Sequence, residues 1–222
     1  MGYEWGFGFL LRYTNLFLIG IGYTLMYTVV TVLLGLVIGL VLGLGRLSPS
    51  WLVNVPLVAF IEVFRCTPLL VQIIWFYYAL PVILDGFQIP AWAAATMVLS
   101  FYTGAFYAEI FRGGILSIER GQWDAAQAVG LRWMVAMRLV ILPQAVRRMI
   151  PPFMNQSIIQ LKNTSLVSTI AVPDLLYQGE LINADTYKPL ETYTVVAVIY
   201  FCLLFPATRL VQAYEGRLAR GR

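Results

Sequence analysis

Amide and hydroxyl side chains that could bind a polar solute are concentrated in one stretch, residues 149–172. Gln156, Gln160 and Asn163 follow one another at i, i+4 and i+7, so a helix would place the three amides on one face. Ser157 lies next to the first of them. Because a polar group that faces lipid is costly, we expect this face either to line a polar pathway or to hydrogen-bond with another helix.

Thr24 is a further candidate for contact with a solute, and it lies in the uncharged stretch 16–45. In this stretch Gly35, Gly39 and Gly43 recur at every fourth position, which leaves one helix face bare enough for close approach of another helix. Helix packing is the simpler interpretation of the stretch, and solute contact by Thr24 is the alternative.

Several kinds of catalytic and cofactor chemistry are excluded by composition. The chain has no histidine, which removes imidazole bases, histidine zinc sites and haem ligation by histidine. Neither Lys162 nor Lys188 follows the glycines of a phosphate-binding loop. We therefore expect no enzyme activity, no metal and no cofactor in this chain, and any ATP would be bound by other chains.

The composition is typical of an integral membrane protein. Of the 222 residues, 60% are hydrophobic and only 12% are charged, about half the charged fraction of soluble domains. The net charge of +4 is explained by arginines in loops, and no basic run is long enough to bind nucleic acid. One membrane domain, residues 1–222, fits this length, with lipid as its surroundings.

The apolar runs predict an all-α protein with transmembrane helices, because only helices and closed barrels satisfy the backbone in lipid. The five predicted spans are residues 16–45, 66–84, 90–108, 149–172 and 193–208. Between the third and fourth spans, residues 112–148 form a long charged loop.

The distribution of arginine predicts the orientation of the chain. Arginines gather after the first span, in the 112–148 loop and in the tail, whereas the alternate loops are mainly acidic. The positive-inside rule then places the N-terminus outside and the C-terminus in the cytoplasm. The 112–148 loop is therefore expected in the cytoplasm, where a soluble partner could reach it.

A short helix is predicted within this loop, from Asp124 to Ala128. Asp124 would lie near the positive N-terminal end, alanine favours the helix, and Gly130 offers a left-handed stop. Such a helix has a shape suited to docking in the groove of a partner, although an ordinary interfacial loop would have a similar composition.

The loop resembles the EAA loop of binding-protein-dependent ABC importer permeases. In that family's pattern E-A-A is followed by three residues and G, then by nine residues and I-x-L-P. Here Asp124 stands for the glutamate and Val140 for the isoleucine, with the spacing kept. The residues to which the resemblance gives a role in coupling to an ATPase are Asp124, Ala125, Ala126, Gln127, Gly130, Leu142 and Pro143.

Other stretches resemble the polar amino acid permeases within this family. The run from Glu62 to Gln72 is similar to E-x-F-R-G-T-P-L-L-V-Q, with Cys66 where glycine is usual. The runs 109–115, 121–123 and 162–166 are similar as well, so the resemblance extends from about residue 22 to residue 200.

The resemblance implies the type I importer fold with five transmembrane helices in a bacterial plasma (inner) membrane. It also implies the partners: a second permease chain, identical or different, two cytoplasmic ATPases that bind ATP and magnesium, and an extracytoplasmic amino-acid-binding protein. The mechanism implied is alternating access, in which the coupling helix moves with the ATPase dimer.

The identity of the transported amino acid is predicted from two positions. In family members that carry arginine or histidine, carboxylates occupy the positions of Gln156 and Asn163. Neutral amides cannot offset a guanidinium in a low-dielectric cavity. We therefore expect glutamate, aspartate, glutamine or a neutral polar amino acid; the alternatives are a basic amino acid, a self-contained secondary transporter, or amides that merely join helices.

Overall fold

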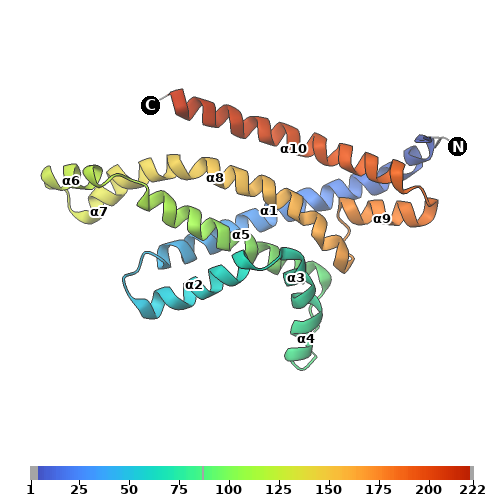
Figure 1. Cartoon of the computed structure of the whole chain (residues 1–222), viewed down its shortest axis with the longest axis horizontal. Helices are drawn as coiled ribbons and strands as arrows, with labels where there is room; N and C mark the ends of the chain where they lie inside the picture. The colour runs from blue at the N-terminus through green and yellow to red at the C-terminus, as the bar shows by residue number, and fades with distance from the viewer. Residues whose placement is uncertain (1–4, 87, 221–222) are drawn as a thin grey trace.

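The computed structural model describes residues 5–86 and 88–220, with side chains as far as Arg217, and these residues form helices and turns without a strand. The side chain of Arg220 and the whole of Arg222, two of the arginines expected in the cytoplasmic tail, lie outside the described part. Figure 1 shows α1, α5, α8 and α10 running along the length of the molecule, with α6 and α7 at one end and α9 at the other.

The centre of the fold is the contact between α1 (Thr14–Gly45) and α5 (Ala91–Leu116). Gly35, Gly39 and Gly43 are buried, and a Cβ added at Gly39 would lie 2.5 Å from the Cβ of Tyr107. The prediction that this stripe serves helix packing is confirmed, because any side chain on it would collide with α5.

The second predicted span, residues 66–84, is found as a helical segment that begins directly after Pro68, and it follows a separate helix at a sharp bend. Helix α2 (Trp51–Cys66) and the segment made of α3 (Leu69–Ile74), η2 (Trp75–Ala79) and α4 (Leu80–Ile83) meet at an angle of 108°. Figure 1 shows α3 and α4 projecting away from the other helices.

The physical cause of this bend is Pro68. Proline disfavours helical geometry at the preceding residue, and Thr67 is extended, with φ −110° and ψ 144°. The carbonyl groups left over at the end of α2 then need donors. The amide nitrogen of Gln72 donates to the backbone oxygens of Phe64 and Thr67, at 3.0 and 3.1 Å. The stretch from Glu62 to Gln72 therefore encodes a break and the side chain that closes it.

Other helix boundaries also extend beyond the predicted spans. Helix α5 continues to Leu116, and α8 (Leu142–Asn163) begins seven residues before the predicted span and passes into a 3₁₀ segment, η4 (Thr164–Ile170). Helix α10 is 32 residues long (Pro189–Arg220). The additional turns of these helices carry polar and charged residues. Helical geometry satisfies their backbone hydrogen bonds, and these turns do not have to lie in lipid.

The segment after the fourth predicted span is helical rather than a polar loop. Helix α9 (Leu175–Thr186) begins at Asp174, whose carboxylate accepts hydrogen bonds from the backbone of Leu176 and Tyr177. Its apolar side packs Leu175 and Ile182 against α1 and α10. An N-cap aspartate directly after Pro173 was the available signal for this helix.

Two helical stretches of the described chain are long and apolar enough to cross a membrane, Gly8–Gly45 and Pro189–Arg217. The bent pair of α2 with the α3 to α4 segment would make a third, if the two halves form one crossing. Helices α5 and α8, which overlap the third and fourth predicted spans, are not among these stretches; α5 is rich in alanine, glycine and tyrosine, and α8 carries many polar side chains.

Candidate functional site

The predicted docking helix is present as α6 (Arg120–Ala128), and Gly130 ends it as predicted. Gly130 has φ +80°, the left-handed conformation that glycine adopts without strain. The N–H of Leu131 donates to the oxygen of Ala126 at 3.1 Å, and that of Gly130 donates to the oxygen of Gln127 at 2.9 Å. These two bonds form a Schellman motif, which satisfies the last carbonyl groups of the helix.

Two details of α6 differ from the prediction. The helix begins at Arg120, so Asp124 lies in its second turn and its first turn has no acidic residue. The two alanines also point in different directions. Ala126 is buried in the fold, only 4% exposed, whereas Ala125 is exposed beside Asp124. The outward face of α6 is therefore formed by Gly121, Asp124, Ala125 and Ala128, and Gln127 is also exposed.

Side-chain contacts hold α6 on the helices that follow it. The rings of Trp123 and Trp133 stack with their centroids 6.2 Å apart, which joins α6 to α7 (Trp133–Ala136). Arg148 of α8 pairs with Glu119 at 3.9 Å and donates to the backbone oxygen of Ser117. A partner that displaces α6 would therefore also pull on α7 and α8.

Leu142 and Pro143 form the start of α8 and follow a π-helical segment, η3 (Met137–Ile141). Proline has no N–H for the regular helix ladder, and the N–H of Leu142 donates instead to the oxygen of Met137, five residues back. Both Leu142 and Pro143 are exposed. Leu142 and Pro143 thus mark the junction between the charged loop and the polar helix α8.

The polar face of α8 divides into two parts. Gln160 is completely buried and donates to the hydroxyl of Thr31 on α1 at 2.9 Å. The hydroxyl of Ser157 lies 2.7 Å from that of Tyr107 on α5. These two residues therefore join helices, one of the alternatives left open by the sequence.

The other part of this face keeps amide groups whose hydrogen-bonding capacity is unused. Gln156 is 7% exposed, and its amide nitrogen is buried without a partner among the described residues. Asn163 lies beside the hydroxyl of Tyr102, and its amide nitrogen is buried without a hydrogen bond of ordinary geometry. Buried donors without acceptors cost free energy, so these two amides are suited to binding a polar solute.

Thr24 has a structural contact in this fold. Its side chain is completely buried, and its hydroxyl accepts a hydrogen bond from the N–H of Leu175 at 3.1 Å. Thr24 thereby attaches the start of α9 to α1, which is the packing interpretation of the first apolar stretch.

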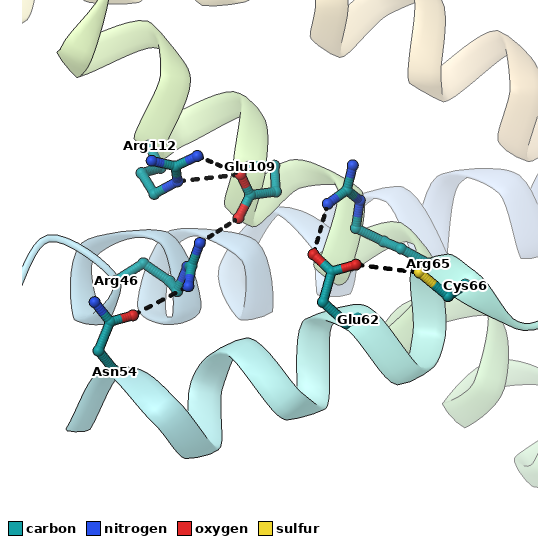
Figure 2. Close-up of polar contacts among 7 residues, drawn as sticks. All are labelled: Arg46, Asn54, Glu62, Arg65, Cys66, Glu109 and Arg112. Carbon is teal, nitrogen blue, oxygen red and sulfur yellow. Dashed lines mark hydrogen bonds and ion pairs between the residues drawn. The ribbon is translucent and has the colours of Figure 1, made fainter. Parts of the chain in front are cut away.

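A charged cluster that sequence reasoning did not single out joins α1, α2 and α5 (Figure 2). Glu109 pairs with Arg112 at 2.9 Å and with Arg46 at 3.3 Å, and Arg46 also donates to the side chain of Asn54 at 3.0 Å. The spacing of Glu109 and Arg112 was a signal for the first pair; nothing in the sequence indicated the contact with Arg46.

A second pair in Figure 2 lies near the end of α2. Glu62 and Arg65, three residues apart on one helix face, form an ion pair at 3.0 Å, and the thiol of Cys66 donates to Glu62 at 3.1 Å. Tyr102, Tyr107 and Thr31, the partners of the polar face, were also missed, because single tyrosines and threonines in apolar runs carry no distinctive pattern.

The described residues form helices and turns, with long apolar helices, buried amides and a short helix whose outer face is exposed, and these are features of a membrane-embedded transporter subunit. Residues 35–220 match the family model of the binding-protein-dependent transport system inner membrane component, and the chain belongs to this family. It is a permease subunit of a polar amino acid ABC importer, and the sequence-based recognition of this class is confirmed.

Individual relatives are consistent with this class. The glutamine transport system permease protein GlnP of Escherichia coli K12 is 39% identical over 173 residues, 78% of this chain and 79% of that protein. The histidine/lysine/arginine/ornithine transport system permease protein HisM of the same strain is 34% identical over 206 residues, 89% of this chain and 87% of that protein. A crystal structure of an amino acid ABC transporter with histidines superposes with a TM-score of 0.91 at 35% identity, covering 97% of this chain and 100% of that one.

Proposed function

We propose that this permease imports glutamine or a chemically similar polar amino acid, namely glutamate, aspartate or a neutral polar one. The observation that carries the proposal is the pair of buried amides at Gln156 and Asn163, each with an amide nitrogen that lacks an ordinary hydrogen bond. The two residues are about 10 Å apart along α8. Both can donate to a carboxylate or a side-chain amide oxygen.

Electrostatics favour this substrate class over a basic one. A guanidinium or ammonium group brought into a buried site needs a compensating negative charge, because the cost of desolvating it is several kcal/mol. The described part of α8 carries no carboxylate. The two relatives are named for different classes, GlnP for glutamine and HisM for histidine, lysine, arginine and ornithine, so a basic substrate is the second candidate.

We further propose the assembly in which the chain works. Five crossings with the N-terminus outside would place α6 in the cytoplasm, in contact with one of two ATPases that bind ATP and magnesium. A second permease chain would complete the pathway, and a binding protein would deliver the amino acid from outside. Two observations support an assembly in which other chains bind ATP: the exposed face of α6 and the absence of a phosphate-binding loop from this sequence.

The substrate assignment is tested by competition between labelled glutamine and unlabelled amino acids during uptake into proteoliposomes that contain the complete transporter. Glutamine, glutamate or a neutral polar amino acid should compete best, and Gln156→Ala should weaken that competition. Gln156→Glu should improve competition by arginine, because it introduces the missing negative charge. Gln88→Glu, the same exchange at an exposed position before α5, serves as the control. Arginine as the preferred substrate of the wild type would defeat the assignment.

Docking is tested at Ala125 rather than at Ala126. Ala125→Trp adds a bulky group to the exposed face of α6 and should prevent the ATPase from co-purifying, while Ala125→Ser should not. Ala126→Trp would disrupt the fold of the loop itself, since Ala126 is buried there. Normal ATP-driven uptake by Ala125→Trp would contradict docking through this face, and uptake without ATP would support a secondary transporter.

A further inference from the structure

Gln144 makes two hydrogen bonds that connect different parts of the docking loop. It is the third residue of α8, and its amide nitrogen donates to the side-chain oxygen of Gln122 on α6 at 3.0 Å. The same nitrogen donates to the backbone oxygen of Val140 in η3 at 2.9 Å. Both amide hydrogens are thus used, which fixes the orientation of the side chain.

The bond to Val140 is a consequence of the neighbouring proline. Because Pro143 lacks an N–H, the backbone ladder changes to five-residue spacing in η3. The side chain of Gln144 supplies an additional donor at this irregular turn. Its position is therefore set by the backbone of the junction between loop and helix, and it does not depend on contact with Gln122 alone.

The bond to Gln122 joins α6 directly to α8, without passing through α7. The ion pair of Arg148 with Glu119 also spans this gap, but it is longer, at 3.9 Å, and 81% of the Glu119 side chain is exposed. The stacked Trp123 and Trp133 join α6 to α7, and Trp123 also packs on the apolar cluster that includes Ala145 and Met149 of α8, a contact without a fixed direction. Of the contacts described, the bond from Gln144 is the one with ordinary hydrogen-bond geometry between the side chains of α6 and α8.

Helix α8 then continues from this junction to the amides of the polar face. Gln144 precedes Gln156 by twelve residues, about 18 Å along one helix. Pro151 and Pro152 interrupt the hydrogen bonds between them. In that region Phe153 packs edge-on against the rings of Tyr107 and Phe111, which supports the helix from α5.

We propose that Gln144 is a positioning residue for energy coupling: by bonding Gln122 and Val140 together it makes α6, η3 and the first turn of α8 move as one body. This inference rests on the proposed function of α6 as the docking helix for an ATPase. A displacement of α6 then reaches Gln156 through α8, and loss of the bond weakens the transfer of that motion to α8.

The measurement is the number of ATP molecules hydrolysed per amino acid imported. Hydrolysis and uptake are both measured in the same proteoliposomes, which contain the complete transporter. Gln144→Leu and Gln122→Leu should each raise this ratio about 2- to 10-fold, the range expected for one hydrogen bond. The double variant should be no worse than Gln144→Leu alone, because Gln144→Leu already removes the bond to Gln122 together with the bond to Val140. Gln88→Leu is the control, and its ratio should equal that of the wild type.

Rescue separates positioning from simple stability. The pair Gln122→Glu with Gln144→Lys replaces the hydrogen bond by an ion pair and should return the ratio toward the wild-type value. An unchanged ratio in Gln144→Leu would overturn the proposal, and so would a raised ratio that accompanies a lower Tm and is not rescued by the ion pair. If no ATPase subunit co-purifies with the wild-type chain, the proposed function fails instead. Co-purification is measured separately from the ratio, so the two failures can be told apart.

Discussion

Gly39→Ala tests how closely α1 and α5 are packed. The added Cβ would lie 2.5 Å from the Cβ of Tyr107, 3.0 Å from the oxygen of Gly104 and 3.1 Å from the nitrogen of Ala108. Ordinary contacts of this kind begin at 3.4 Å, so the helices must separate by about 0.9 Å, the difference between 3.4 and 2.5 Å. Two of the three atoms belong to backbone, and rotation of a side chain cannot relieve those contacts.

The expected change in stability follows from two opposing effects. Overpacking a close contact costs about 1–3 kcal/mol, and replacing glycine by alanine within a helix gains about 0.5–1 kcal/mol. The net effect is a loss of up to about 2.5 kcal/mol, centred near 1 kcal/mol, which corresponds at that centre to a Tm lower by about 2–4 °C for a chain of this size. Displacement of Tyr107 would also stretch its 2.7 Å contact with Ser157 and reduce transport.

Gly22→Ala provides the matched control, because Gly22 lies in the same helix and its added Cβ would meet nothing within 4 Å. This variant should be as stable as the wild type or slightly more stable. The assay is thermal unfolding of the purified chain in one detergent, followed by tryptophan fluorescence. A Gly39→Ala variant as stable as Gly22→Ala would refute the argument that the glycine stripe is required for close packing.

Three further predictions concern charge and backbone conformation. Burial raises the pKa of Asp174 to about 6, so the folded chain holds this proton more tightly than the unfolded chain. The associated stability is complete below the ordinary carboxyl pKa and is lost as the pH rises through 6. The Tm of the wild type minus that of Asp174→Asn should therefore be larger at pH 5 than at pH 8, and an equal difference would contradict the shift. Glu109→Gln removes the ion pair with Arg46, in which both side chains are less than one fifth exposed. It should lower the free energy of unfolding, measured with denaturant, by about 1–3 kcal/mol. Glu62→Gln, at a more exposed pair, should lower it by less than about 1 kcal/mol. Gly130→Ala should destabilise the chain by about 1 kcal/mol through its φ of +80° alone, since no atom lies within 4 Å of the added Cβ; a Tm equal to that of the wild type would show that α6 does not need this stop.

The sequence predicted those features that depend on local spacing. The glycine stripe of α1, the stop at Gly130 and the Glu62–Arg65 pair each follow from residues that are neighbours along one helix. The class of protein was predicted from a resemblance, that of the spaced residues from Asp124 to Pro143 to the EAA loop of binding-protein-dependent permeases.

Features that depend on tertiary contact were not predictable from this sequence. An apolar run looks the same whether it is straight or bent by 108°, although Thr67 and Pro68 marked where the bend occurs. Likewise, Gln156 and Gln160 have the same chemistry, and only the position of Thr31 on α1 separates the amide that joins helices from the one that remains available. Ala125 and Ala126 differ for the same reason, because burial of one depends on the helices beneath α6.

The packing of α1 against α5 has a consequence for the order in which the chain is made. The glycine stripe of α1 ends at Gly43, but the helix that covers it is complete only at Leu116. At a synthesis rate of about 5–20 residues per second, the nascent chain therefore carries the open groove for several seconds before its partner helix exists. During that time the groove must be filled by lipid or by the insertion machinery, and the arrival of α5 displaces whatever occupies it.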